Sequence, residues 1–180
     1  MIRLFVGLEL PEEMRQRLAF LGSGLPGARW VDPGNYHLTM RFIGEVDGGR
    51  FEDIHAALTR IKAPALDLTL EGISTFGKAD APHTLWVGVQ RNATLAALHA
   101  KVDRALVTAG LEPESRKFQP HVTLARLRKN AAGRLGSFVA RHSLFRAGPG
   151  RIEHFVLFSS FLQRSGAIYA PEAHYSLSAG

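Results

Sequence analysis

A four-residue pattern of histidine, apolar residue, threonine and apolar residue occurs twice in this chain. It stands at residues 37–40 (HLTM) and again at residues 121–124 (HVTL). Successive side chains of a β-strand point to opposite faces, so the histidine and threonine of each copy share one face and the apolar residues share the other. The pattern therefore predicts two strands that each carry a polar pair above an apolar back.

The likeness between the two copies extends upstream of both. An apolar run at residues 4–8 (LFVGL) and a helical pattern at 11–21 precede the first copy, and a run at 85–89 (LWVGV) and a helical pattern at 94–106 precede the second. A supersecondary unit that is used twice determines the architecture of a chain. We expect an α+β fold with two mainly antiparallel sheets, helices packed outside them, and a pseudo-twofold axis between the histidine-threonine strands.

The rest of the chain supplies further elements without a linker of low complexity. The patterns predict a turn at 32–35, a helix around 51–61, an alternating strand at 66–71, a basic loop at 126–134, a short helix at 135–139, a strand at 154–162, and a final strand or hairpin at 166–177. We therefore expect a single domain, residues 1–180, built from two similar lobes.

The composition is typical of a globular protein and excludes cysteine chemistry. With 180 residues, 46 % hydrophobic and 21 % charged, the chain can form one compact domain with a sizeable core. The absence of cysteine excludes disulfide scaffolds, thiolate metal sites and cysteine nucleophiles. The sequence has no apolar run near the ~18 residues of a membrane span and no signal-peptide pattern, which predicts a cytoplasmic protein.

The charge balance favours an anionic partner. The formal net charge is +6, and arginine outnumbers lysine by 17 to 5. Guanidinium groups pair with phosphate through two parallel hydrogen bonds, so this excess suits a phosphate-bearing or polyanionic ligand. Genomic base composition that favours arginine codons explains the same excess equally well.

Several segments together resemble one known family. They are the two motifs, the opening at residues 3–11 (RLFVGLELP), the segment at 120–126 (PHVTLAR) and the segment at 166–169 (GAIY). They are similar to the LigT-like RNA 2',3'-cyclic phosphodiesterases of the two-histidine (2H) phosphoesterase superfamily, over nearly the whole chain. The resemblance implies a bilobal fold with the active cleft between the lobes, and hydrolysis of RNA 2',3'-cyclic phosphate ends to 2'-phosphomonoesters.

The resemblance also implies partners and cofactors. The substrates would be RNAs with 2',3'-cyclic phosphate ends, including tRNA fragments, or cyclic nucleotides. It implies no cofactor, no membrane association and a monomer. A metal site formed by His37 and His121 is not expected, because neither motif carries a carboxylate or a second histidine at ligand spacing.

The chemistry explains why two such motifs are needed. Attacking and leaving oxygens lie on opposite sides of phosphorus, so a base and an acid must approach from opposite directions. The resemblance assigns His37 as the proton donor to the leaving oxygen and His121 as the proton acceptor that activates water. Thr39 and Thr123 share the faces of their histidines and can donate hydrogen bonds to the other phosphoryl oxygens.

An arginine follows each motif, and strand alternation indicates which face its side chain takes. Arg126 matches the arginine that helps to hold the phosphate in the family. Strict alternation from His121 places Ala125 on the histidine face instead, so a bulge or the end of the strand must turn Arg126 toward it. Arg41 shares the face of His37 by alternation, although it fits a solvated strand arginine equally well.

Other aromatic residues and histidines are weaker candidates for the functional site. Phe42, Phe118 and Tyr36 can stack a nucleobase at the rim of the cleft, although each is more typical of a core residue. The remaining histidines share no pattern; they are His55, His83, His99, His142, His154 and His174.

The sequence is also compatible with two alternative functions. The same site run in reverse would join RNA ends through a 2',5' linkage. A noncatalytic RNA-binding module would use the basic cleft without chemistry.

Overall fold

A computed structural model describes residues 1–179; Gly180, the last residue of the predicted domain, lies outside the described part. In chain order the elements are β1 (Ile2–Glu9), α1 (Glu12–Ala19), β2 (Ala28–Trp30), β3 (His37–Val46), α2 (Gly48–Thr59), β4 (Leu66–Lys78), β5 (Ala81–Val89), α3 (Ala93–Thr108), β6 (His121–Leu127), α4 (Ala132–Arg141), β7 (Arg146–Ile152), β8 (His154–Gln163) and β9 (Gly166–Ser176). Short 3₁₀ turns, Pro33–Asn35 and Lys129–Ala131, precede β3 and α4.

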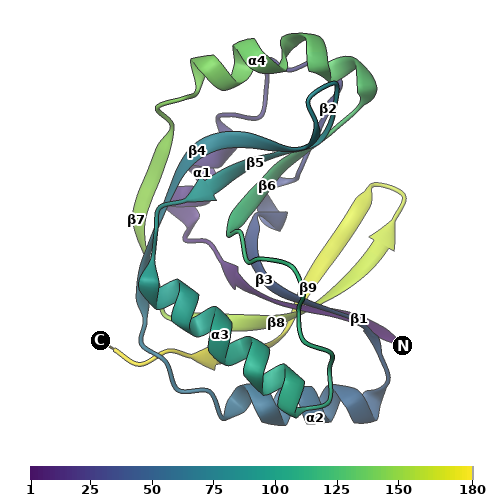
Figure 1. The fold of residues 1–180 in the computed structure, drawn as a ribbon, viewed down its shortest axis with the longest axis vertical. Coiled ribbons are helices and arrows are strands. Elements are labelled where there is room, and N and C mark those ends of the chain that lie inside the picture. The colour runs from purple at the N-terminus through teal and green to yellow at the C-terminus, as the bar shows by residue number, and fades with distance from the viewer. Residues whose placement is uncertain (180) are drawn as a thin grey trace.

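The strands form one curled sheet (Figure 1). Its order is β7-β4-β5-β6-β3-β1-β8-β9, with β2 paired to β6, and the strands pair antiparallel throughout this order. The two motif strands, β3 and β6, meet at one pair of residues, Leu38 and Val122. This contact corrects the prediction of two sheets: the central strands of the two lobes pair, so the sheet is continuous.

The strand order is symmetric about the contact between β3 and β6. Outward from it lie β6, β5, β4 and β7 on one side, and β3, β1, β8 and β9 on the other. Strand β4 comes from the first half of the chain yet extends the lobe of the second motif, while β8 and β9 come from the second half and extend the lobe of the first. Each lobe therefore contains strands from both halves.

The main core lies between the helices and one face of the sheet. It includes Leu38 and Val122 from the motif strands, and the buried stripes of the helices, such as Leu18, Leu58 and Leu98. Asp47 caps α2 and Asn92 caps α3, each by accepting a hydrogen bond from a backbone N–H in the first turn. Because the helices cover the face that carries the apolar motif residues, the histidine face is left open on the concave side.

A second, smaller apolar cluster lies on this concave face. It consists of Phe5 from β1 and of Val156 and Phe158 from β8, with Tyr169 from β9 packed against it. The β8–β9 hairpin rises beside the central strands in Figure 1. This arrangement gives the first motif an aromatic wall from strands that lie far away in sequence.

The sequence predictions match most elements and miss two strands, the short β2 and β7. Strand β7 was not predicted, because its residues (RAGPGRI) lack apolar alternation; it forms by pairing with β4 at the edge of the sheet. The final strand or hairpin is one strand, β9, paired along β8. Within the described residues, no helix combines the length and apolar character needed to cross a membrane.

Candidate active site

The two motif histidines occupy equivalent places. From His37 along β3 and from His121 along β6, buried and accessible residues follow in the same order over the length of β6. In the neighbouring strands, Glu9 of β1 pairs with His37 and Gly88 of β5 pairs with His121. Because β3 and β6 run antiparallel through Leu38 and Val122, the histidines lie on opposite sides of the crossing and on the same face of the sheet.

Backbone carbonyls orient both imidazoles in the same way. Nδ1 of His37 lies 2.7 Å from the carbonyl oxygen of Asn35, and Nδ1 of His121 lies 2.7 Å from that of Gln119. A carbonyl only accepts hydrogen bonds, so Nδ1 carries the hydrogen in each ring and the neutral ring has its lone pair on Nε2. In His37 this nitrogen accepts from the Thr39 hydroxyl at 3.0 Å.

Burial lowers the pKa of both histidines. For His37, burial is the main cause, the Asn35 carbonyl acts in the opposite direction, and positive charge on His121 lowers the pKa further. For His121, burial again dominates, the Gln119 carbonyl raises the pKa, and the Arg126 guanidinium lowers it. Positive charge on His121 makes protonation of His37 harder, so the pair disfavours the doubly protonated state.

Aromatic rings enclose each histidine. The His37 ring lies 4.9 Å from Phe5, with the edge of Tyr169 at 4.8 Å and Phe158 at 6.0 Å. The His121 ring meets Phe76 edge-on at 4.9 Å and Trp86 at 5.7 Å. These rings account for the loss of water around the imidazoles.

None of these five rings was predicted from the sequence to be a site residue. The sequence does contain an indication of two of them, because Phe5 and Trp86 hold the same place in the two repeated apolar runs.

A bulge turns Arg126 toward the histidine side. The pairing of β5 with β6 shifts register, so that Thr123 lies opposite Trp86 and Ala125 lies opposite Leu85, with Leu124 as the extra residue. Ala125 is therefore buried in the main core and Arg126 is exposed on the other face. The expected bulge is present and places Arg126 close enough to lower the pKa of His121. Its guanidinium donates to the Thr84 hydroxyl at 2.9 Å.

The first motif contains the matching bulge with different residues. The register of β1 with β3 shifts so that Gly7 pairs with Thr39 and Val6 pairs with Arg41. Arg41 is therefore buried at 7 % exposure, whereas Phe42 is 59 % exposed and lies 6.1 Å from Phe5. Phe42 thus takes the place that Arg126 has in the second motif, so the site carries a cation on one side and an aromatic ring on the other.

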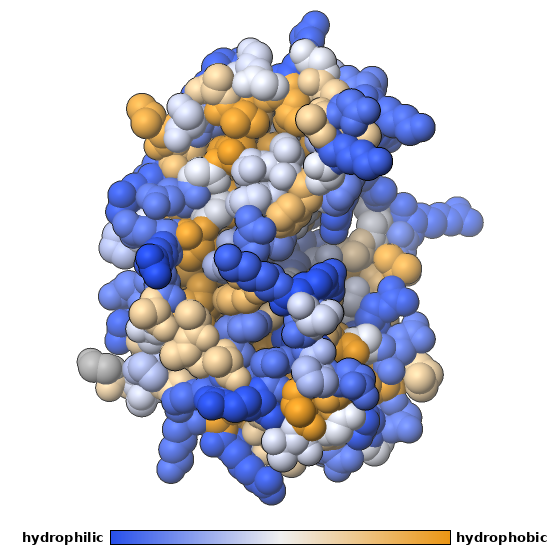
Figure 2. Space-filling model, viewed as in Figure 1, coloured by the Kyte–Doolittle hydropathy of each residue, from blue (hydrophilic) through white to orange (hydrophobic). Residues whose placement is uncertain are grey.

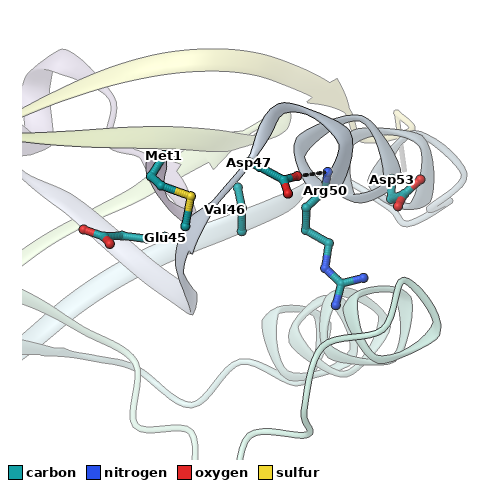
Figure 3. A pocket seen from close by; sticks show the side chains of 6 residues that line it. All are labelled: Met1, Glu45, Val46, Asp47, Arg50 and Asp53. Carbon is teal, nitrogen blue, oxygen red and sulfur yellow. Dashed lines mark hydrogen bonds between the residues drawn. The ribbon is translucent and has the colours of Figure 1, made fainter.

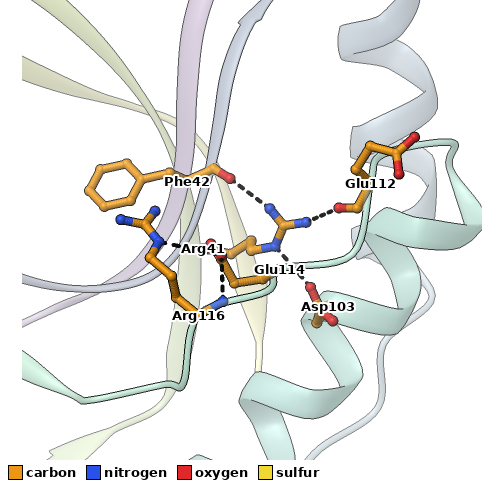
Figure 4. A network of polar contacts seen from close by, with 6 residues as sticks. All are labelled: Arg41, Phe42, Asp103, Glu112, Glu114 and Arg116. Atoms are coloured by element: carbon orange, nitrogen blue, oxygen red, sulfur yellow. Dashed lines mark hydrogen bonds and ion pairs between the residues drawn. The ribbon is translucent and has the colours of Figure 1, made fainter.

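Arg41 is buried in a network of polar contacts (Figure 4). This burial corrects both sequence interpretations of the residue. Its Nε donates to the Asp103 carboxylate of α3 at 2.8 Å, and its other nitrogens donate to the carbonyls of Phe42 and Glu112. The bulge directs the side chain away from the His37 face and away from solvent. Arg41 thereby ties β3 to α3 and to the segment that leads into His121.

The other two aromatic candidates are not placed to stack a base beside His37 or His121. Phe118 stacks on His99 with 3.8 Å between ring centroids, and Tyr36 is buried in the main core. Of the three predicted stacking residues, Phe42 is the one that is exposed on the histidine side.

Two hollows differ in the charge of their walls. One, of about 230 Å³, is lined by His37 together with Tyr36, Phe158, Tyr169 and Glu9 among others. Figure 2 shows a hollow near the centre of the face in view.

The other hollow, of about 440 Å³, lies at the start of α2 (Figure 3). Its wall carries the carboxylates of Glu45, Asp47 and Asp53, with the Arg50 backbone N–H bound to Asp47. These three carboxylates outnumber the one arginine of that wall, Arg50, and repel an anionic ligand. In the hollow beside His37 one carboxylate, Glu9, is matched by one arginine, Arg15, so this hollow suits phosphate better.

Comparison with known proteins supports the division of the chain into two similar parts. The model of the family LigT like Phosphoesterase matches the chain twice, at residues 8–86 and 87–169. An RNA 2',3'-cyclic phosphodiesterase from Aeropyrum pernix is 33 % identical over 158 residues, which cover 86 % of this chain and 89 % of that protein. One from Geobacillus stearothermophilus is 34 % identical over 128 residues, 68 % of this chain and 41 % of that protein.

Solved structures give the same result. The crystal structure of LigT from E. coli in its apo form has a TM-score of 0.76 at 25 % identity, and the match covers 98 % of both chains. The matching family model spans most of the sequence and divides it where the repeat divides it. The chain therefore belongs to the LigT-like phosphoesterase family, as the paired histidine motifs indicated.

Proposed function

We propose that this protein is a hydrolase, an RNA 2',3'-cyclic phosphodiesterase that opens the cyclic phosphate to a 2'-phosphomonoester. The observation that carries the proposal is the symmetric placement of His37 and His121 on one face, each with Nδ1 held by a backbone carbonyl. The names of the relatives from Aeropyrum pernix and Geobacillus stearothermophilus support hydrolysis of RNA 2',3'-cyclic phosphates, and the choice of the 2' product is part of the proposal.

In the proposed reaction His121 is the base. Its neutral ring offers the lone pair of Nε2 because Nδ1–H is donated to the carbonyl of Gln119. It takes a proton from water while the water oxygen bonds to phosphorus. The bond between phosphorus and the 3' oxygen breaks on the opposite side, and Nε2–H of His37 supplies the proton that this oxygen needs.

The proposed acid must gain a proton before it can act. Burial and the charge of His121 both disfavour protonated His37 in the free protein. A bound phosphate diester brings one negative charge between the rings, which favours the protonated form of the acid. The repulsion between the rings supports one protonated and one neutral imidazole, which is the state the reaction uses.

The remaining motif residues stabilise charge in this proposal. The hydroxyls of Thr39 and Thr123 lie on the faces of their histidines and donate to the nonbridging phosphoryl oxygens. Arg126 is exposed beside His121 and adds the cation that the oxygens need. Phe42, in the equivalent place across the site, offers an aromatic face to the base of the terminal nucleotide.

The test is a product assay in excess chelator. Wild-type protein is incubated with a short RNA that ends in a 2',3'-cyclic phosphate, and the isomeric monophosphates are resolved. We expect the 2'-phosphate without added metal, because acid, base and hydrogen-bond donors all come from the chain. His37→Ala and His121→Ala should each lower the rate by about 10²- to 10⁴-fold.

The control variant is His55→Ala, which replaces a histidine that bonds the Tyr175 hydroxyl at 2.8 Å and should retain activity. A 3'-phosphate product, a strict need for a divalent ion, or nearly full activity in either motif variant would contradict the proposal.

A further inference from the structure

Three side chains outside the two motifs form a compact cluster. Glu9 at the end of β1 lies between His154 at the start of β8 and His174 in β9. Nε2 of His154 is 3.4 Å from one carboxylate oxygen of Glu9, and Nε2 of His174 is 3.2 Å from the other. The two imidazole centroids are 4.9 Å apart. One ligand atom from each residue lies within 4.8 Å of the others.

Strand pairing brings these residues together from three distant parts of the chain. Strand β8 pairs with β1 on one side and with β9 on the other, and Val156 is paired with both Gly7 and His174. Glu9 lies two residues after Gly7 in β1, and His154 lies two residues before Val156 in β8. Because side chains alternate between the two faces of a strand, Glu9, His154 and His174 all lie on the face that Val156 occupies. That is the concave face, which also carries Phe5 and Phe158.

We propose that Glu9, His154 and His174 bind a divalent transition-metal ion of the Zn²⁺ class. Two imidazole nitrogens and one carboxylate are the donor set that Zn²⁺ accepts in open, three-ligand sites. Ions such as Mg²⁺ and Ca²⁺ prefer oxygen ligands alone, so they fit this set poorly.

The distances suit a shared ion better than direct ion pairs. Tetrahedral ligands at roughly 2.0–2.1 Å from Zn²⁺ lie about 3.3 Å from one another. The two nitrogen–oxygen separations, 3.2 and 3.4 Å, are close to this value. Charge-assisted hydrogen bonds between nitrogen and oxygen are shorter, about 2.7–2.9 Å. The two nitrogens approach different oxygens of Glu9, and the three ligand atoms lie within 4.8 Å of one another, so side-chain rotation would bring the imidazoles together on one ion.

The cluster is accessible and borders the hollow beside His37. The three side chains are 40–48 % exposed, so an ion can reach them from solvent. Glu9 lines the hollow that His37 also lines, and the two residues are paired across β1 and β3. A bound ion would add positive charge to that wall and keep a coordination position for water or an anionic ligand. The ring opening proposed above does not use this ion.

The experiment measures metal binding without substrate. The full chain is stripped of metal with a chelator, dialysed, and titrated with Zn²⁺ by calorimetry, with Mg²⁺ in a parallel titration. We expect one Zn²⁺ per chain and no comparable binding of Mg²⁺. Glu9→Gln and His174→Gln should each weaken Zn²⁺ binding by at least about tenfold, as loss of a ligand costs no less than loss of an outer-shell partner.

The matched control is His142→Gln, which replaces a histidine at the end of α4, in contact with Phe138. It should bind Zn²⁺ as the wild type does. Circular dichroism checks that each variant is folded, and Co²⁺ provides a second readout, because its visible absorption reports coordination by nitrogen and oxygen.

Absence of Zn²⁺ binding in the wild type, or equal binding in folded Glu9→Gln and His174→Gln, overturns the metal site. Both results leave the phosphodiesterase proposal untouched, because no substrate takes part in these measurements.

Discussion

His37 and His121 share a motif but have different electrostatic neighbours. Each imidazole is held by a carbonyl two residues upstream, and burial lowers the pKa of each. Arg126 lowers the pKa of His121, whereas His37 responds to the charge of His121 itself. This difference follows from the two bulges, which expose an arginine beside one histidine and Phe42 beside the other. The division into acid and base can therefore be tested through pH.

We predict a bell-shaped pH dependence of kcat/KM on a cyclic nucleotide. Activity falls at low pH as His121 takes up a proton and ceases to be a base, and falls at high pH as His37 loses the proton it must donate. Both pKa values lie below the ordinary value near 6.5, so the maximum should lie on the acidic side of pH 7. Arg126→Gln removes a cation that lowers the pKa of His121, so the acidic limb should move to higher pH.

A substrate with a nitrophenolate leaving group separates the two roles, because this group leaves without a proton. It should partly restore the rate of His37→Ala and leave His121→Ala inactive. Equal recovery in both variants, or an unchanged acidic limb in Arg126→Gln, would show that the roles are assigned wrongly.

At the scale of elements, the close approach of β1 to β3 depends on a glycine. Gly7 pairs with Thr39, and a Cβ atom added at Gly7 would lie 2.6 Å from the carbonyl oxygen of Leu38. The contacted atom is backbone of the motif strand itself, so it cannot move without shifting His37 and Thr39. Gly7 stands in the apolar run at the place that Gly88 holds in the second run.

We predict that Gly7→Ala lowers the free energy of unfolding by roughly 1–3 kcal/mol, the usual cost of forcing extra atoms into a packed site. Chemical denaturation measures it. Gly136→Ala in α4 is the matched control, because an added Cβ there meets no atom within 4 Å. Alanine is the better helix former, so this variant should gain about 0.5–1 kcal/mol. Similar stability changes in the two variants would refute the steric explanation.

At the scale of the whole molecule, positive charge is in excess and part of it lies next to the second motif. The chain carries a formal charge of +6. Arg126, Arg128 and Lys129 are exposed at the end of β6 and in the turn that follows. The backbone of an RNA substrate that extends from the proposed site along this side would pass these cations one after another.

We predict that KM for an RNA with a 2',3'-cyclic phosphate end rises with salt more steeply than KM for a cyclic mononucleotide. Binding of each further phosphate releases counterions, and salt opposes that release. Lys129→Ala should reduce the slope for RNA, while Arg60→Ala, at the end of α2, should leave it unchanged. Identical slopes for the two substrates would restrict recognition to the terminal nucleotide.

Features set by nearest neighbours along the chain could be predicted from the sequence alone. The two motif strands, the shared face of each histidine and threonine, and the helix stripes depend on local periodicity, which the side chains display directly. The duplication and the family likewise followed from residues that recur in order.

Features set by strand pairing were decided only by the tertiary structure. The partner strands β1 and β5 determine the register shifts that bury Arg41 and expose Arg126, and no local pattern distinguishes a strand with a bulge from one without it. Pairing of β3 with β6 merged the two predicted sheets, and pairing of β1, β8 and β9 assembled Glu9, His154 and His174. Register is a property of two chain segments together, so residues far apart in sequence become neighbours only when the sheet forms.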